Sequence, residues 1–133
     1  MAGGGERADM KISSAKAKGR RLQNWVGEKA SKLTSLPCGP DCPIEPRQMG
    51  QNGVDIRLDR EARSAFPWSV ECKNQETWSI GSWIDQAQTN TYEGTDWLLV
   101  LSKNRTQPVV VLDAEVFFSL LEKVQRLRRT RTK

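Results

Sequence analysis

The sequence contains no histidine. This absence removes the side chain that most often acts as a general base near neutral pH, and with it the Ser-His and Cys-His nucleophile systems. It also excludes zinc sites that use histidine ligands. Any hydrolytic chemistry in this chain must therefore depend on carboxylates, on lysine and on a hard metal ion that prefers oxygen ligands.

Cysteine is scarce, and we expect no export signal at the start of this sequence. The three cysteines are Cys38, Cys42 and Cys72, and the N-terminal stretch MAGGGERADMK has no apolar run after its charges. An odd cysteine count without a secretory signal argues against a disulfide framework. A structural zinc site made by these three thiols is one alternative, but no second cysteine pair accompanies the C-G-P-D-C spacing, which favours ordinary loop and core cysteines.

Long apolar runs are also missing. No segment approaches the roughly 20 residues needed to cross a bilayer, so we expect no membrane partner and a cytoplasmic location, in the host cell if the chain is phage-encoded. With 133 residues, of which 37% are hydrophobic, the chain suffices for one domain with a modest core. We expect a disordered tail over residues 1–12, a single domain over residues 13–125 and a basic tail over residues 126–133.

Positive charge is concentrated at the two ends of the chain. The net charge is +5 and the isoelectric point is about 9.4. A basic balance favours polyanionic partners such as DNA, because neutralising phosphates releases counterions. The residues expected to contact phosphates on the first helix are Lys16, Lys18, Arg20 and Arg21. The C-terminal run of Arg126, Arg128, Arg129, Arg131 and Lys133 could add nonspecific contacts.

Apolar periodicity indicates the order of helices and strands. It predicts helices over residues 14–34 and 79–92 and after the N-cap Asp113. Alternating or continuous apolar runs predict strands over residues 54–58, 68–72, 97–101 and 108–112, with a short strand over residues 44–48. The polar residues 59–67 are expected to form a turn or an excursion between two strands. This order predicts an α/β or α+β domain built on one central mixed β-sheet flanked by helices.

Three polar residues on two of these strands could form a reaction site. Glu71 and Lys73 are two residues apart, so their side chains leave the same face of a strand, opposite the apolar Trp68, Val70 and Cys72. If the strand of Asp55 pairs with this strand, the two carboxylates meet on one surface. Such a pair suits Mg²⁺, with Mn²⁺ as a substitute, and the carbonyl of Cys72 could be a further ligand. Lys73 could orient or deprotonate a water and offset phosphate charge.

The pattern G-V-D followed by V-E-C-K resembles the PD-(D/E)xK nuclease superfamily over residues 16–112. Within it, Lys18-Gly19-Arg20 is most similar to the first helix of small Holliday-junction resolvases and phage-type nucleases. The resemblance implies a restriction-endonuclease-like core of order α-β-β-β-α-β, here with an extra strand and a C-terminal helix. It also implies a metal-dependent DNA endonuclease, selective for branched or junction DNA, acting in DNA recombination as a homodimer.

The resemblance assigns roles to individual residues. Asp55 and Glu71 would hold the metal, Lys73 would act in catalysis, and Gln86, followed by Ala87, matches a glutamine that contacts the active site or phosphate. The chain departs from the pattern at Val54, which replaces the proline, and on the first helix. There Gln23, a candidate DNA contact, is nearest to the usual glutamate, while the helix's one glutamate in the predicted range is Glu28.

The tryptophans divide between core and surface. Four of them lie on apolar stripes and are expected in the core, namely Trp25, Trp68, Trp83 and Trp97, whereas Trp78 lies off the pattern and is the one expected to face DNA. Two other functions compete with the nuclease. One is a non-catalytic DNA-binding accessory protein on a nuclease-derived fold, and the other is a small protein-interaction domain.

Overall fold

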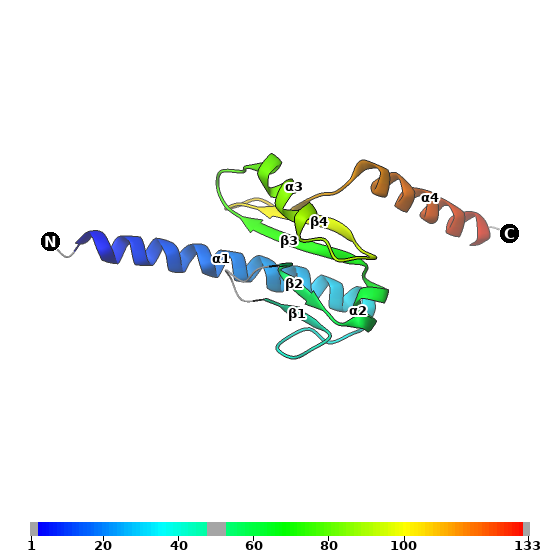
Figure 1. Cartoon of the computed structure of the whole chain (residues 1–133), viewed down its shortest axis with the longest axis horizontal. Coiled ribbons are helices and arrows are strands. Elements are labelled where there is room, and N and C mark those ends of the chain that lie inside the picture. The colour runs from blue at the N-terminus through cyan, green and yellow to red at the C-terminus, as the bar shows by residue number, and fades with distance from the viewer. Residues whose placement is uncertain (1–2, 48–52, 132–133) are drawn as a thin grey trace.

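A computed structural model describes residues 3–47 and 53–131 of the chain (Figure 1). In chain order the elements are α1 (Gly3–Thr34), β1 (Ile44–Pro46), β2 (Ile56–Leu58), α2 (Arg60–Ala65), β3 (Trp68–Asn74), α3 (Ile80–Thr89), β4 (Asp96–Ser102), β5 (Val109–Val111) and α4 (Ala114–Arg131). The fold is therefore mixed α/β, as expected from the sequence. Gln48, the expected end of the first short strand, and residues 1–2 and 132–133 of the expected tails lie outside the described residues.

Helix α1 is longer than its apolar stripe. We expected a disordered tail up to residue 12, whereas α1 begins at Gly3. The segment from Glu6 to Lys11 contains mostly residues with good helix propensity, which accounts for the extension. The N-terminal part of α1 projects beyond the sheets, and the two ends of the chain lie at opposite sides of the molecule (Figure 1).

The buried face of α1 is formed by Leu22, Val26 and Ala30 together with small residues. Our expectation that Trp25 lies in the core was wrong, because its side chain is 40% exposed. Gly27 explains why α1 turns a different side toward the core. A Cβ at this position would lie 2.7 Å from the Cys38 sulfur and 3.1 Å from Pro46 Cγ, so glycine lets α1 approach β1 closely. Gly27 thus weakens the helix but permits its close packing.

The strands form two sheets and not the one mixed sheet expected. β1 pairs antiparallel with β2, while β3 pairs in parallel with β4, which pairs antiparallel with β5. The sheets are joined where the Asp55 N–H donates to the Val70 carbonyl, 2.9 Å away. One step further along β3, the Cys72 N–H donates to Asp55 Oδ2 at 2.7 Å. A side chain here accepts the bond that a strand carbonyl would otherwise accept, so the regular ladder ends at Asp55.

The two faces of β3 have different neighbours, as the alternation of residues predicted. Val70 and Cys72 pack with the apolar face of α1 in one core cluster. Glu71 and Lys73 lie opposite Leu99 and Leu101 of β4, whose side chains belong to a second cluster with Trp83 of α3. Helix α3 lies on this second face, on the side of β3 and β4 opposite to α1 (Figure 1). Glu71 and Lys73 therefore emerge between the sheet and α3.

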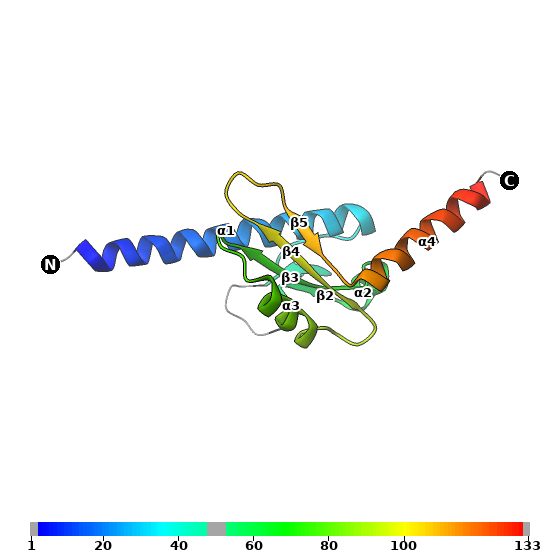
Figure 2. The ribbon, with the colours of Figure 1, turned by 90° about the horizontal axis from the view of Figure 1, so that it is seen from above.

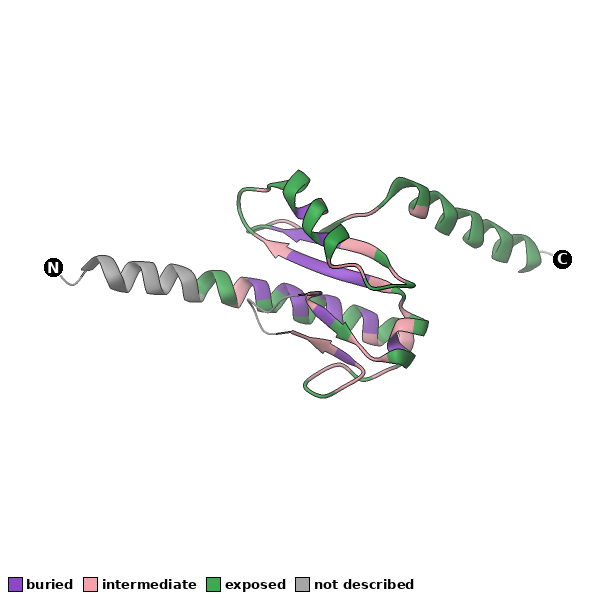
Figure 3. Ribbon diagram, in the orientation of Figure 1, coloured by how far each residue is buried: buried purple, intermediate pink, exposed green. Residues whose placement is uncertain are grey.

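Two helices differ from expectation. Residues 60–65, expected within a turn, form the short helix α2, whose first turn is capped by the Asp59 carboxylate accepting from the Ala62 N–H at 2.8 Å. Helix α4 extends to Arg131, into the segment expected to be a tail. It does not pack on the sheet, and none of its residues is buried (Figure 3). Within the described residues, no helix is both long and apolar enough to span a bilayer.

Candidate active site

Asp55 is held at the junction of the two sheets by its backbone and its side chain. Its N–H donates to Val70, and its own carbonyl accepts from the Arg47 N–H at 2.8 Å. Its carboxylate accepts the bond from Cys72 described above. Two bonds to β3 and one to the residue after β1 leave Asp55 little freedom, which is the condition for a precisely placed ligand or base.

Glu71 is a buried carboxylate with incomplete hydrogen bonding. Its side chain is only 2% exposed, and Asn90 Nδ2 donates to Oε1 across 3.5 Å. Oε2 is buried and accepts no hydrogen bond from any residue that the structure describes. Burial and the neighbouring charge of Asp55 raise the pKa of Glu71 to about 7, against the smaller opposing effects of Lys73 and Asn90.

The pKa of Asp55 is shifted by the same kinds of effect. Burial raises the pKa of Asp55, while the hydrogen bond from Cys72 and the charges of Lys73 and Arg47 lower it. Asp55 and Lys73 thus both act on Glu71, and Lys73 acts on both carboxylates. Such mutual shifts require short separations in a poorly solvated region. The structure brings together the three residues that the sequence motif singled out.

Lys73 approaches the carboxylates from the α3 side. Its side chain is half-buried, and Nζ lies 5.8 Å from the ring centre of Trp83, which is itself buried. The aromatic face can stabilise the ammonium group and restrict its rotamers. A positioned cation beside two carboxylates can orient a water molecule or offset the charge of a phosphate.

The polar groups present fit a divalent cation. The buried carboxylate of Glu71, with one oxygen that no described residue satisfies, and the half-buried carboxylate of Asp55 form a concentration of negative charge that a cation would neutralise. The N–H and C=O of one strand residue point to the same edge, so the Cys72 carbonyl points toward Asp55. Asp55, Glu71 and this carbonyl could therefore hold the ion, with water completing its coordination.

The alternative zinc site receives no support from the structure. In the described parts of the chain, no three or more Cys, Asp or Glu side chains gather into a metal-binding group. The Cys72 thiol is buried, and burial together with Asp55 and Glu71 raises its pKa well above its usual value. Burial, Glu28 and Cys42 likewise raise the pKa of Cys38. Raised pKa values disfavour the thiolate form that zinc binds.

Two residues of the site were missed by sequence reasoning. Asn90, just after α3, donates to Glu71 and also to the Gly53 carbonyl at 3.4 Å. Arg47, just after β1, lowers the pKa of Asp55 through its charge, and its guanidinium lies 3.0 Å from where a Gly53 Cβ would be. Both follow the end of a secondary-structure element and carry no motif, so only their charge or amide group could have suggested them.

The other predicted residues are distributed around this cluster. Gln86 is exposed on α3, and Trp78 is half-buried in the second core cluster, donating from Nε1 to the Ser102 carbonyl at 3.3 Å. Gln23 is 1% exposed, so its side chain faces the interior of the fold. This burial does not fit the DNA contact that we expected Gln23 to make. Gln23 lies one turn before Gly27, on the face of α1 that approaches β1.

The basic residues of α1 lie near the end of β3. Lys16, Arg20 and Arg21 are exposed and Lys18 is half-buried. The Lys18 carbonyl accepts from Asn74 Nδ2 at 3.1 Å, and Asn74 directly follows Lys73. The basic segment and the carboxylate pair therefore approach the same end of β3, where one phosphate backbone could contact both.

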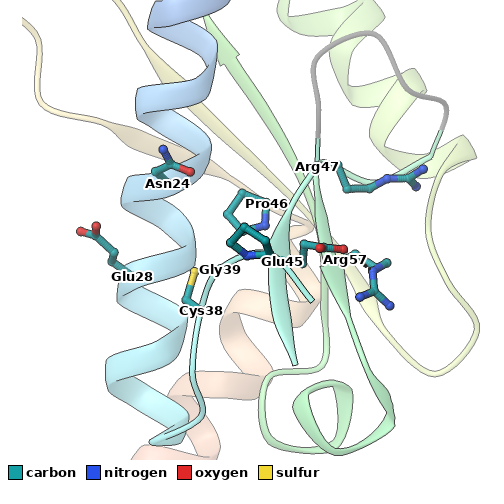
Figure 4. A pocket seen from close by; sticks show the side chains of 9 residues that line it. Asn24, Glu28, Cys38, Gly39, Glu45, Pro46, Arg47 and Arg57 are labelled. Carbon is teal, nitrogen blue, oxygen red and sulfur yellow. Dashed lines mark hydrogen bonds and ion pairs between the residues drawn. The ribbon is translucent and has the colours of Figure 1, made fainter. Parts of the chain in front are cut away.

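A separate cavity of about 720 Å³ lies between α1 and β1 (Figure 4). Its lining residues are Asn24, Glu28, Cys38, Gly39, Pro40, Glu45, Pro46, Arg47 and Arg57. Arg57 is held by Glu45 at 2.7 Å, and the Arg47 side chain points away from α1 in the close view. Asp55, Glu71 and Lys73 do not line this cavity, so it is distinct from the carboxylate cluster.

An aspartate at a sheet junction, followed by E-x-K on the adjacent strand with all three side chains electrostatically coupled, defines a site of the PD-(D/E)xK nuclease type. The comparison with family models gives the more particular result. Residues 16–133 match the model of the family described as phage putative PDDEXK endonuclease, and the chain belongs to this family. Membership implies the restriction-endonuclease-like fold and hydrolysis of phosphodiester bonds. Neither the curated proteins nor the solved structures contain a match.

Proposed function

We propose that the chain is a Mg²⁺-dependent DNA endonuclease whose reaction is carried by Asp55, Glu71 and Lys73. The observation that carries the proposal is the buried Glu71 carboxylate beside Asp55, with one oxygen unsatisfied among the described residues. A stable fold gains nothing from a buried carboxylate beside a second, half-buried one unless a cation neutralises the pair. Mg²⁺ is the preferred ion because every donor in the set is oxygen, and Mn²⁺ accepts the same donors.

Each residue of the site has a distinct part in this reaction. Asp55, Glu71 and the Cys72 carbonyl hold the ion, and Asn90 orients Glu71. When bound, the metal polarises a phosphoryl oxygen and lowers the pKa of water. Lys73 orients the attacking water and offsets the charge that develops on the phosphate. Arg47 supplies a second positive charge on the side of Asp55. Gln86, exposed on α3, contacts the DNA backbone.

The substrate enters along the exposed basic face of α1. Lys16, Arg20 and Arg21 contact phosphates there, and Trp78, in the segment after β3, is a further DNA contact. We further propose selectivity for branched or junction DNA, a role in DNA recombination, a homodimeric state that places two sites on one substrate, and action in the cytoplasm of a host cell. The selectivity, the role in recombination and the homodimer rest on the resemblance of Lys18-Gly19-Arg20 to junction resolvases, and the location in a host cell is supported by the phage family.

The decisive experiment is nicking of supercoiled plasmid in Mg²⁺, Mn²⁺ or EDTA. The wild type should nick with either ion and not in EDTA, and Asp55→Asn and Glu71→Gln should be inactive in all three. Glu93→Gln removes an exposed carboxylate far from the motif in sequence and serves as the matched control. A four-way junction, a flap and a linear duplex, incubated side by side, test the structure selectivity. DNA binding by a folded wild type that never cleaves would favour the non-catalytic accessory protein instead.

A further inference from the structure

Helix α4 exposes an apolar surface that no part of the described chain covers. It stands away from the sheets in both ribbon views (Figures 1 and 2), and no residue of it is buried. Its exposed large apolar side chains are Phe117, Phe118, Leu120, Leu121, Val124 and Leu127. Apolar surface of this extent on one helix is unusual for a monomer and marks an interaction site.

The spacing of these residues is that of a coiled-coil seam. Residues 113, 117, 120, 124, 127 and 131 follow one another at alternating intervals of four and three, which places them on one stripe of the helix. The stripe begins with Asp113, continues through four apolar residues and ends with Arg131. It is therefore symmetric about position 122, with an acidic residue at one end and a basic residue at the other.

This symmetry makes the stripe complementary to an antiparallel copy of itself. In one register, Phe117 lies opposite Leu127 of the second copy, Leu120 lies opposite its Val124, and Asp113 lies opposite its Arg131. A two-fold interface requires such self-complementarity, since the same patch serves both partners. The charges oppose parallel pairing, because Arg131 of the stripe and the basic last turn around it would then lie beside the same residues of the second copy.

We propose that α4 is a dimerisation helix, which pairs antiparallel with α4 of a second copy of this chain. The four apolar positions of the stripe become buried, and the Asp113–Arg131 pairs close both ends of the interface. Since α4 lies apart from Asp55, Glu71 and Lys73, the pairing can be tested independently of whether the chain is a nuclease. It gives the assembly two copies of the carboxylate cluster, related by a two-fold axis.

The first test is the mass of the full-length protein in sedimentation equilibrium. The wild type should have twice the 15.0 kDa mass of the chain, and Leu120→Glu should return it to the monomer mass. Ser119→Glu introduces the same charge on the opposite, exposed side of α4 and should remain dimeric. Circular dichroism separates loss of pairing from unfolding. A wild type that stays monomeric at all accessible concentrations, or a Leu120→Glu variant that stays dimeric, would overturn the proposal.

The second test determines the orientation by cysteine cross-linking. Phe117→Cys protein mixed with Leu127→Cys protein should form a covalent dimer under mild oxidation, while each variant alone should not exceed the wild-type background from the native cysteines. Parallel pairing predicts the reverse, with each variant cross-linking to itself. That result, or no cross-link above wild type in the mixture, would refute the antiparallel register.

Discussion

Replacing Glu71 with glutamine should stabilise the metal-free protein while abolishing cleavage. Burial and the proximity of Asp55 raise the pKa of Glu71 from 4.5 to about 7. The folded state therefore binds this proton more tightly than the unfolded chain does. The stability that the protonated form supplies is complete below about pH 4.5, and it is lost as the pH rises through about 7. Glutamine has nearly the same shape and has no charge to lose.

The magnitude follows from the two pKa values. The difference between 4.5 and about 7 is about 2.5 pH units, and at about 1.4 kcal/mol per unit the ionised Glu71 costs about 3 to 4 kcal/mol. Most of this loss, about 2 to 3 kcal/mol, falls between about pH 5 and pH 8. The side chain is 2% exposed, so solvent screening reduces the value little. Glu71→Gln should therefore gain about that much stability relative to wild type over this interval.

The assay is urea denaturation in EDTA at about pH 5 and at about pH 8. Unfolding is followed by the fluorescence of the five tryptophans. Comparing each variant with wild type at the same pH cancels the titration of other groups. Glu93→Gln should show no such dependence. If the difference in unfolding free energy between Glu71→Gln and wild type is the same at both pH values, the buried, charge-repelled state assigned to Glu71 is wrong. Added Mg²⁺ should reduce the gap at the higher pH, because the ion stabilises the ionised carboxylate.

Further predictions concern the neighbours of Glu71 and the binding of DNA. Lys73→Met should lower the cleavage rate by about 100-fold or more while DNA affinity, measured by fluorescence anisotropy, changes little, because its charge matters most in the transition state. Asn90→Leu removes a hydrogen bond that lowers the pKa of Glu71, so the acidic limb of the cleavage pH profile should move to higher pH; an unmoved limb would exclude this positioning role. DNA affinity should fall with salt at a log–log slope of about −0.9 per phosphate neutralised. Arg20→Gln should reduce the magnitude of this slope by about 0.9, because one phosphate contact is lost. A salt-independent affinity would contradict phosphate binding by α1. Ca²⁺ should support binding with little cleavage, and metal analysis that finds stoichiometric zinc would contradict the oxygen-ligand site.

Local patterns in the sequence predicted most of the elements. Strand β3 lies where alternation placed it, and its two faces are divided as the spacing of Val70, Glu71 and Cys72 required. The period of two in a strand is a local property, so it could be read without knowledge of the fold. The motif likewise singled out Asp55, Glu71 and Lys73 from residue type and spacing alone.

Long-range packing decided what local patterns could not. Trp25 lies outside the core because glycine at position 27 lets another side of α1 approach β1. Helix α4 is apolar on one stripe, as the sequence predicted, yet it does not pack on its own sheet. An apolar stripe indicates that a helix face needs a partner, but not whether that partner belongs to the same chain.

The sequence by itself determined which residues could carry the chemistry, because residue type and a spacing of two are written in the chain. Only the tertiary structure decided their protonation and their surroundings. The pKa of Glu71 depends on its burial and on Asp55, which is 16 positions earlier in the chain and is brought to β3 by the bond to Cys72. Asn90 and Arg47 are likewise brought to the site by the tertiary structure and not by a sequence motif. Electrostatic coupling depends on distance and on exclusion of water, and neither quantity exists until the strands and helices have packed.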